Sequence, residues 1–495
     1  MEREPQPQPQ PGPEWEPGAR ARAGAGAGAG AWAWAGARVG AGCDACPSPA
    51  LLRPDGPVPE RRTGYRCALL LDSRRRSYVD SSQFISVHKE IRPHRGDSMN
   101  ARTRRTTLAL AAVTVTALAG CQARHQAPEA SPSRQSSGQP AAPSSGHPAA
   151  PAPRTGFTLV ASGDIVPDTS IIERAQFDAG GLGYDFRPML AGSGPAVSGA
   201  DLAICHMNAV YGEDGDPSGS PALKAPPQMA DALAATGYDG CSTASDHSLD
   251  DGADGIRRTL DAFDRAGVRH AGSARTQEEA KSVTMMRAGD AQVAHLAYTV
   301  GPKDRSLPEG QPWAVDLLDR DKIVEDARVA RRAGADVVVV SLHWGTEWQD
   351  APDEQQLKLA KQLTASRTGG RADIDLILGT HAHVPQAYEK VDGTWVVYGL
   401  GDQIAGETDS RGIRDPRGNV STIARFTFAP PAHEGERWPV ARAEFVPQAF
   451  DVDAGRVVDL TAALQQGADV GALRDRIRDV VLSRGAAQAG LVMAQ

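Results

Sequence analysis

The chain has 495 residues and a formal net charge of −8 at pH 7. A chain of this length has room for more than one domain. The negative charge argues against nucleic acid as the main partner, because phosphate backbones are bound by basic surfaces. The sequence contains neither a P-loop nor a dinucleotide-binding glycine motif, so it does not indicate a nucleotide-binding fold of either type.

Residues 1–98 do not have the pattern of a folded domain. Glycine and alanine alternate through Ala21–Val39, and the flanking sequence is rich in proline. Such a composition cannot bury enough apolar surface to offset the entropy lost on folding, so we expect a long disordered N-terminal region. Cys43 and Cys46 have the spacing of a metal or redox pair, but no second pair accompanies them, and coincidence is the better interpretation.

Residues 99–121 predict a secretory signal. Three arginines follow Met99, and the apolar run Leu108–Leu118 comes next, ahead of two small residues and Cys121. A basic segment followed by an apolar run that is too short to span a bilayer comfortably is typical of a signal peptide. Because such a signal acts at the start of a chain, we interpret Met99 as the true initiator and residues 1–98 as an upstream extension assigned in error.

The end of this segment, Leu118-Ala119-Gly120-Cys121, resembles the lipobox of bacterial lipoproteins. The resemblance implies cleavage before Cys121 and lipidation of that residue. The protein would then be extracytoplasmic, and the membrane would be its partner through a lipid anchor on the outer face of the bacterial cell membrane. Residues 122–154 are rich in Pro, Ser, Ala and Gln, which predicts a flexible linker between the anchor and the folded domain.

From residue 155 onward, apolar runs of strand length alternate with amphipathic helical segments. Strands are predicted at Phe157–Asp164, Ala200–Ile204, Tyr238–His247, Thr284–Ala288, Gln292–Tyr298, Ala335–Leu342, Ile374–Leu378, Ala387–Val391, Thr394–Tyr398, Ser421–Ala429 and Val440–Val446. Helices are predicted at Pro227–Thr236, Asp254–Ala266, Asp321–Arg332, Pro352–Ser366 and Val470–Ser483. This alternation predicts a layered α/β sandwich with mixed β-sheets over residues 155–450. Residues 451–495 are expected to form a tail with one helix, packed outside the site or free.

Two of the predicted strands lead directly to histidines. The β-branched run that begins at Ala335 ends at His343, and the apolar run that begins at Ile374 leads to His381 and His383. Both runs predict strands that are covered on both faces. In open α/β sheets, ligands gather outside the carboxyl ends of the strands, so we expect these imidazoles to meet at one edge of the sheet.

Carboxylates occupy the matching positions of two strands further upstream. Asp164 ends the first strand of the domain, and Asp246 ends the third. Imidazole and carboxylate together suit a divalent cation such as Mn, Zn or Fe, and two such ions about 3.5–4 Å apart form the usual clamp for phosphoryl chemistry. The sequence therefore predicts a site for two divalent ions, with the ligands Asp164, Asp246, His343, His381 and His383.

Six short motifs lie in order between Thr155 and Asp409. They are Gly163-Asp164, Ala200–Ile204, Ala244–Gly252, His343–Trp348, His381–Gln386 and Tyr398–Gln403. Together they resemble the CapA family of poly-γ-glutamate capsule synthesis proteins, whose domain is similar to the calcineurin-type metallophosphoesterases. The resemblance implies a metallophosphoesterase-like α/β fold and makes His247 the counterpart of the histidine that protonates a leaving group. It also implies the metal ligands Asp164, His343, His381 and His383.

Three positions depart from the family pattern. Asn208 stands where the family has a glutamate, whereas Asp246 and Asp402 stand where the family has asparagine. An aspartate adds a full charge near the cations and strengthens their hold, which keeps Asp402 among the candidate site residues together with Asn208. One hypothesis is that Asp246 compensates in part for the carboxylate lost at Asn208. The other is that the site has drifted and no longer turns over.

Four further residues each have two interpretations. His206 either supplies a nitrogen ligand near the gap at Asn208 or faces solvent. Glu347 either acts in the site, by orienting an imidazole or contacting substrate, or forms a surface salt bridge. Cys205 and Cys241 lie in apolar strand patterns, where buried free thiols are the default, and a disulfide between them is the alternative.

Two functions from different classes follow from these patterns. The first is a metal-dependent hydrolase that uses His247 as its proton donor. Its substrate would be a phosphoester, as the fold of the family suggests, or an amide bond of a glutamate polymer, as the biology of the family suggests. The second is a non-catalytic role in binding, exporting or anchoring an anionic surface polymer together with capsule-synthesis proteins. A turnover measurement distinguishes the two.

Overall fold

The computed structural model describes residues 154–495, except residues 214–215, 304, 407–408, 411–412, 415 and 434. The expected disordered region, the signal peptide, Cys121 and almost all of the linker lie outside the described residues. Within the described part of the chain, no helix is both long and apolar enough to cross a bilayer.

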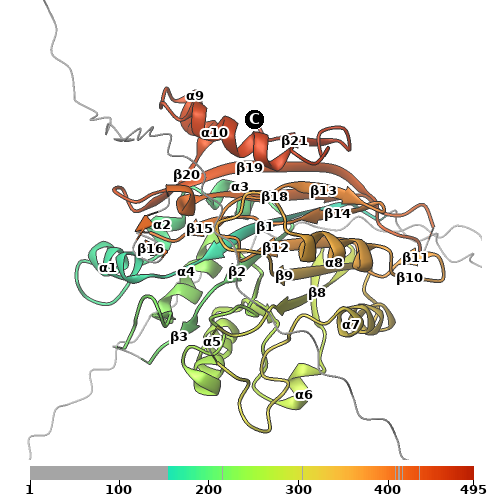
Figure 1. The fold of residues 1–495 in the computed structure, drawn as a ribbon, viewed down its shortest axis with the longest axis horizontal. Helices are drawn as coiled ribbons and strands as arrows, with labels where there is room; N and C mark the ends of the chain where they lie inside the picture. Colours follow the sequence, from blue (N-terminus) through green and yellow to red (C-terminus); the bar gives the residue numbers. More distant parts are fainter. Residues whose placement is uncertain are drawn as a thin grey trace, which may run out of the picture. The chain divides into compact units, whose positions relative to one another are not determined.

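Two large sheets form the centre of the fold (Figure 1). The larger contains, in spatial order, β20 (Arg456–Asp459), β19 (Val440–Asp451), β18 (Val420–Phe428), β1 (Phe157–Ile165), β2 (Leu202–Met207), β5 (Gly240–Ser242) and β6 (Arg269–Ala271), with β15 (Asp402–Ile404) beside β1 and β21 (Leu491–Met493) beside β19. The smaller contains β13 (Tyr388–Val391), β14 (Thr394–Val397), β12 (Leu376–Thr380), β9 (Val337–His343), β8 (Ala291–Thr299) and β7 (Thr284–Ala288). Both sheets are mixed, because parallel central strands are flanked by antiparallel ones.

The remaining elements are helices and three short strand pairs. The helices are α1 (Thr169–Asp178), α2 (Arg187–Leu190), α3 (Gly194–Ser198), α4 (Gln228–Thr236), α5 (Gly252–Ala266), α6 (Gln277–Ala280), α7 (Arg320–Arg332), α8 (Glu354–Thr364), α9 (Leu460–Gln465), α10 (Gly471–Val481) and the 3-10 helix η1 (Pro416–Asn419). The pairs are β3 (Val210–Tyr211) with β4 (Lys224–Ala225), β10 (Arg367–Thr368) with β11 (Arg371–Ala372), and β16 (Asp409–Ser410) with β17 (Ile413–Arg414).

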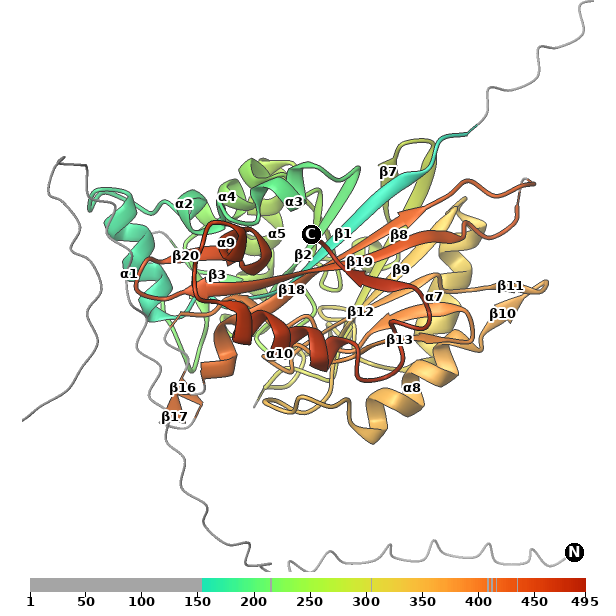
Figure 2. The same cartoon turned by 90° about the horizontal axis from the view of Figure 1, so that it is seen from above.

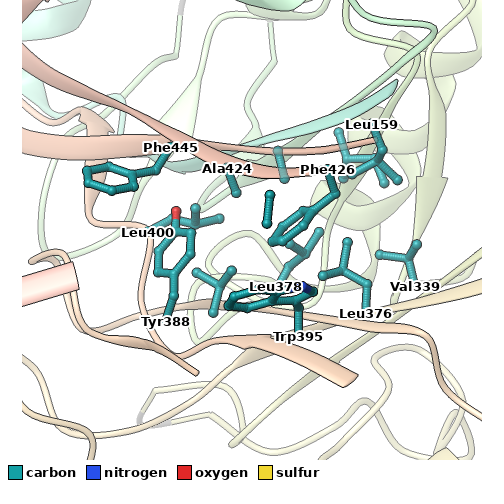
Figure 3. Close-up of a cluster of buried hydrophobic side chains, with 14 of the residues drawn as sticks. Leu159, Val339, Leu376, Leu378, Tyr388, Trp395, Leu400, Ala424, Phe426 and Phe445 are labelled. Carbon is teal, nitrogen blue, oxygen red and sulfur yellow. The ribbon is translucent and has the colours of Figure 1, made fainter. Parts of the chain in front are cut away.

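The two sheets pack face to face around one apolar layer (Figure 3). Leu159 and Phe426 enter this layer from the larger sheet, and Leu376 and Trp395 enter it from the smaller sheet. The rings of Trp395 and Phe426 lie 6.1 Å apart, so the sheets are in direct contact. Because side chains alternate along a strand, the other face of each sheet also has to be covered.

Helices cover both outer faces, which completes the layered α/β sandwich that the sequence predicted. Helices α1 to α5 lie on one side of the sheets, and α7 and α8 lie on the other (Figure 2). Helix α7 buries Ile323, Ala327 and Ala330, which recur at helical spacing on one face. Asp353 caps α8 by accepting from the backbone of Gln356, whose side chain reaches back to it as a capping box.

The five predicted helices are confirmed as α4, α5, α7, α8 and α10, each end lying within two residues of its prediction. The predicted strands are also confirmed, but β5 ends at Ser242 instead of continuing to His247, and β19 continues to Asp451 instead of ending at Val446. Helix α1 was not predicted, because its buried residues Ile171, Ile172 and Ala175 form too short an apolar pattern to stand out in the sequence.

The segment after residue 450 belongs to the sheet. Strands β20 and β21 both pair with β19, and α9 and α10 lie over it (Figure 1). Ile477 and Val481 of α10 are buried in the same apolar cluster as Phe426. Arg484, just beyond α10, pairs with Glu389 on β13 at 2.8 Å. The segment therefore packs outside the site, one of the two arrangements expected for it.

Cys205 and Cys241 correct the expectation of free thiols. They are register partners on the adjacent strands β2 and β5, with Cα atoms 4.4 Å apart, and a disulfide joins them. The sequence does not contain the register of two strands separated by a helix, so it could not show that the two sulfurs meet.

Candidate metal centre

The predicted site residues meet where parallel strands of both sheets end. Asp164 near the end of β1 is in register with His206 on β2 and with Asp402 on β15. His343 ends β9, and its register partner on β12 is Thr380, the residue before His381. The backbone N–H of His381 donates to Oδ2 of Asp164 at 3.2 Å, which joins the two sheets at this edge.

Two glycines allow the backbones to approach here. A Cβ atom at Gly163 would lie 1.8 Å from the carbonyl oxygen of Gly401, and one at Gly379 would lie 2.0 Å from that of Tyr398. No other residue fits at either position without moving the neighbouring strand. His381 and His383 follow with φ of 88° and 59°, in the left-handed region, at a cost of order 1–3 kcal/mol each. Strain of this kind is typical of functional sites.

Asp164, His206 and His343 form the first group that could hold a metal ion. Oδ1 of Asp164 lies 3.3 Å from Nε2 of His206 and 3.7 Å from Nδ1 of His343. The two imidazole rings stack with centroids 4.8 Å apart. All three side chains are buried, so water competes little for their lone pairs.

Asp246, His343 and His381 form the second group. Nε2 of His343 lies 2.9 Å from Oδ1 of Asp246 and 3.1 Å from Nδ1 of His381. His343 thus belongs to both groups and turns one ring nitrogen toward each. A neutral imidazole has a single free lone pair, so His343 ligates one ion at a time, and the other group then needs oxygen ligands or water to complete its set.

Unpaired buried atoms test whether these residues fit a cation. Among the described residues, Oδ1 of Asp164, Nε2 of His206 and Oδ1 of Asn208 are buried without a hydrogen-bond partner. Leaving such an atom unpaired costs about 1–3 kcal/mol, and a divalent cation would accept its lone pair. His206 bonds Ser242 through Nδ1 at 2.6 Å, which leaves Nε2 for a metal. The donor set therefore fits divalent ions.

The protonation states also suit a metal. Burial lowers the pKa of His206 well below its usual value and lowers that of His381 to about 3, so both imidazoles are neutral at pH 7. Burial raises the pKa of Asp164, so a cation displaces a proton there. Burial alone would also raise the pKa of Asp246, but the hydrogen bond with His343 brings it below its usual range.

His383 lies in neither group found among the described residues. Its Nδ1 lies 3.0 and 3.1 Å from the two carboxylate oxygens of Asp402, and its ring stacks on Trp348 at 5.0 Å. Although burial disfavours its charged form, Asp402 raises the pKa of His383 to about 10, which makes the two an ion pair. Asp402, which stands where the family has asparagine, thus binds His383, one of the predicted metal ligands.

His247 lies beside the second group, next to a cavity of about 400 Å³. Its Nε2 is 3.7 Å from Oδ2 of Asp246, and its Nδ1 is 2.6 Å from Oδ2 of Asp250. Burial would lower the pKa of His247, but the Asp250 hydrogen bond and Asp246 raise it, which favours the proton that a general acid needs. The sequence reasoning missed Asp250, although it lies three residues after His247 within the same motif.

Glu347 faces the same cavity and has the salt bridge that was its alternative interpretation. Its Oε1 lies 3.4 Å from Nζ of Lys303. The backbone N–H of Lys303 in turn donates to the carbonyl oxygen of Asp246 at 2.7 Å. Lys303 was not singled out from the sequence, because no pattern marks a residue in the long segment between β8 and α7.

A family model described as "Bacterial capsule synthesis protein PGA_cap" matches residues 158–407. The capsule biosynthesis protein CapA of Bacillus anthracis is 27% identical over 187 residues, which cover 36% of this chain and 43% of that protein. The PGA biosynthesis protein CapA of Bacillus subtilis (strain 168) is 28% identical over 163 residues, or 32% of this chain and 41% of that protein. The matched region thus spans less than half the length of these curated relatives.

Two solved structures show weaker likenesses to this chain. A putative 5'-nucleotidase from Staphylococcus aureus is 16% identical with a TM-score of 0.37, and the match covers 66% of this chain and 58% of that one. The calcineurin-like phosphoesterase YfkN from Bacillus subtilis is 14% identical with a TM-score of 0.35, and the match covers 66% of this chain and all of that one.

Proposed function

The chain belongs to the PGA_cap family of bacterial capsule synthesis proteins, and from that premise we propose that it is a divalent-metal-dependent hydrolase acting on an anionic surface polymer of the poly-γ-glutamate type. The observation that carries the proposal is the pair of buried His/Asp groups that share His343. Capsule synthesis is what the matching descriptions name, and hydrolysis is the chemistry that such a donor set supports best.

The residues of the candidate site have separate roles in the proposed reaction. Asp164, His206 and His343 would hold one cation, and Asp246 and His381 would hold a second beside His343. Cations bound there would supply a Lewis acid and a water molecule of lowered pKa. His247 donates a proton to the leaving group, and Asp250 keeps its ring in place through the hydrogen bond at Nδ1. The scissile bond is an amide of the glutamate chain or a phosphoester.

A second candidate function rests on the pairing of His383 with Asp402. If this ion pair persists when metal binds, His383 is not a ligand, and the site holds its cations with fewer nitrogens. A weakly held metal would favour a role in binding, exporting or anchoring the polymer alongside other capsule-synthesis proteins. This role needs the same cavity but not the proton of His247.

Turnover separates the two functions. We expect the full chain, loaded with manganese or zinc, to cleave a γ-linked glutamate polymer or a generic phosphodiester, and a chelator to abolish the cleavage. Product release is followed by chromatography for the polymer and by absorbance for the ester. Absence of cleavage of both substrates with every metal tested would contradict the hydrolase and leave the polymer-binding role.

We also propose an extracytoplasmic location through lipidation of Cys121, which the lipobox-like ending of residues 99–121 supports. The expected result is a mature protein that begins at Cys121 and carries acyl chains, detected by mass spectrometry of protein extracted from bacterial membranes. A Cys121→Ser variant should leave the membrane fraction. An unmodified peptide that contains Ser98 and Met99 together would show that residues 1–98 are retained and would contradict the assignment.

A further inference from the structure

The segment between β8 and α7 brings two cations to the cavity beside His247. Lys303 and Arg305 are the only lysine or arginine among the described residues that line this cavity. The segment is tied to both metal groups, because the N–H of Val300 donates to the carbonyl oxygen of His343 at 3.0 Å and that of Lys303 donates to Asp246 at 2.7 Å. The backbone therefore holds Lys303 beside the metal centre, and Arg305 lines the same cavity.

Lys303 and Arg305 each form a long ion pair with a carboxylate in the structure. Lys303 contacts Glu347 at 3.4 Å, and Arg305 contacts Asp250 at 3.8 Å. The side chains of Lys303 and Arg305 are 53% and 45% exposed, so solvent weakens both ion pairs. Lysine has three donors and arginine five, so both can donate to a ligand oxygen without first breaking a strong bond.

Part of the remaining cavity wall is apolar, and Asp168, Asp250 and Glu347 add three carboxylates to it. Trp348 is held in place by its stacking on His383 and by a backbone bond to Ala382 at 2.9 Å, and it lines the cavity together with Pro221 and Leu223. A γ-linked glutamate chain presents two methylenes and one free α-carboxylate in each residue. The apolar wall matches the methylenes, and the two cations match the carboxylate.

We propose that Lys303 and Arg305 form a subsite for the α-carboxylate of a γ-linked glutamate residue adjacent to the cleaved bond. The proposal rests on the proposed function for the identity of the polymer, but it concerns recognition and not the chemical step. Recognition of this charge would select a γ-linked glutamate chain over a chain that is uncharged at that position. Lys303 and Arg305 are thus specificity residues that never touch the reacting atoms.

The test is a binding measurement on the full-length, zinc-loaded protein. A His247→Ala background slows cleavage, so affinity can be measured whether or not the protein turns over. The probes are a short γ-linked glutamate oligomer and the same oligomer with every α-carboxylate converted to a carboxamide. Titration calorimetry at two salt concentrations gives the dissociation constants.

We expect Lys303→Ala and Arg305→Ala each to weaken binding of the carboxylate oligomer roughly three- to fivefold, and the double variant to weaken it about tenfold with a smaller dependence on salt. The matched control is Lys358→Ala, an exposed lysine on α8 away from the cavity lining, which should leave the affinity unchanged. Circular dichroism and thermal unfolding should be the same for all variants, because the three side chains are at the surface.

Three outcomes would overturn the subsite: no measurable binding of the oligomer, equal affinity for the carboxamide probe, or a double variant that binds like Lys358→Ala. Failure of the hydrolase is a different result. A protein that discriminates between the probes but cleaves neither substrate keeps the subsite and loses the reaction. A protein that cleaves the polymer but does not discriminate keeps the reaction and loses the subsite.

Discussion

His343→Ala should abolish binding of the divalent ion that His343 ligates and weaken binding of the other, whereas His206→Ala should abolish binding of one ion and leave the other unchanged. The reason is that His343 belongs to both buried groups and His206 to the first alone. Loss of an outer-shell partner of a metal ligand already costs about 10–100-fold in affinity, so loss of a shared ligand should cost at least about a hundredfold. Elemental analysis of zinc-loaded protein after dialysis gives the stoichiometry.

The matched control is His295→Ala. His295 is a buried histidine on β8, next to β9, and it bonds Ser341 at 2.9 Å outside either group. This variant loses the same side chain from an equally buried position but should keep full stoichiometry. If His343→Ala retained both ions, the two groups would not be the metal site. If only His206→Ala retained both, the first group would be wrong, and His206 would not replace the carboxylate lost at Asn208.

His247→Ala should lower kcat by about 10²–10⁴-fold while the metal content stays at the wild-type level. A general acid acts only in the chemical step, and among the described residues His247 lies in neither metal-holding group. Asp250→Asn should lower kcat less, because the histidine remains but the bond that orients its ring is weakened. The measurement is steady-state kinetics on the better of the two substrates, paired with elemental analysis of the same protein samples.

Two surface variants control for nonspecific loss. His433→Ala removes an exposed histidine, and Asp254→Asn changes an exposed aspartate in the first turn of α5, close in sequence to Asp250. Both should retain wild-type kcat. Wild-type kcat in His247→Ala would exclude the residue as the proton donor, and an equal loss in metal content would show that it acts through the cations instead.

Much of the fold could be predicted because each strand and helix carries its own pattern. The β-branched run of β9 and the spaced apolar residues of α7 are local signals, and both elements appear where predicted. The end of the short strand β5 was predicted less accurately than the ends of the helices. Strand β5 stops at Ser242, so Asp246 and His247 lie in the turn that follows instead of in the strand.

The sequence predicted the residue types of the candidate site and some of its residues. Asp164, Asp246, His343 and His381 were expected to meet, and the structure brings them together because each lies at or just beyond the end of a strand at the same edge. For His206, the sequence left open whether the side chain is a ligand or faces solvent. It gains its place because the register of β2 against β1 sets it beside Asp164.

What the sequence determined by itself was the order of strands and helices, the layered α/β class and a set of imidazoles and carboxylates at strand ends. Hydrophobic period and strand length are properties of a continuous stretch of chain, so one sequence contains them. Only the tertiary structure decided how these residues pair. It joined Cys205 to Cys241 and tied His383 to Asp402, because strand register and the approach of two sheets depend on contacts between segments far apart in the chain.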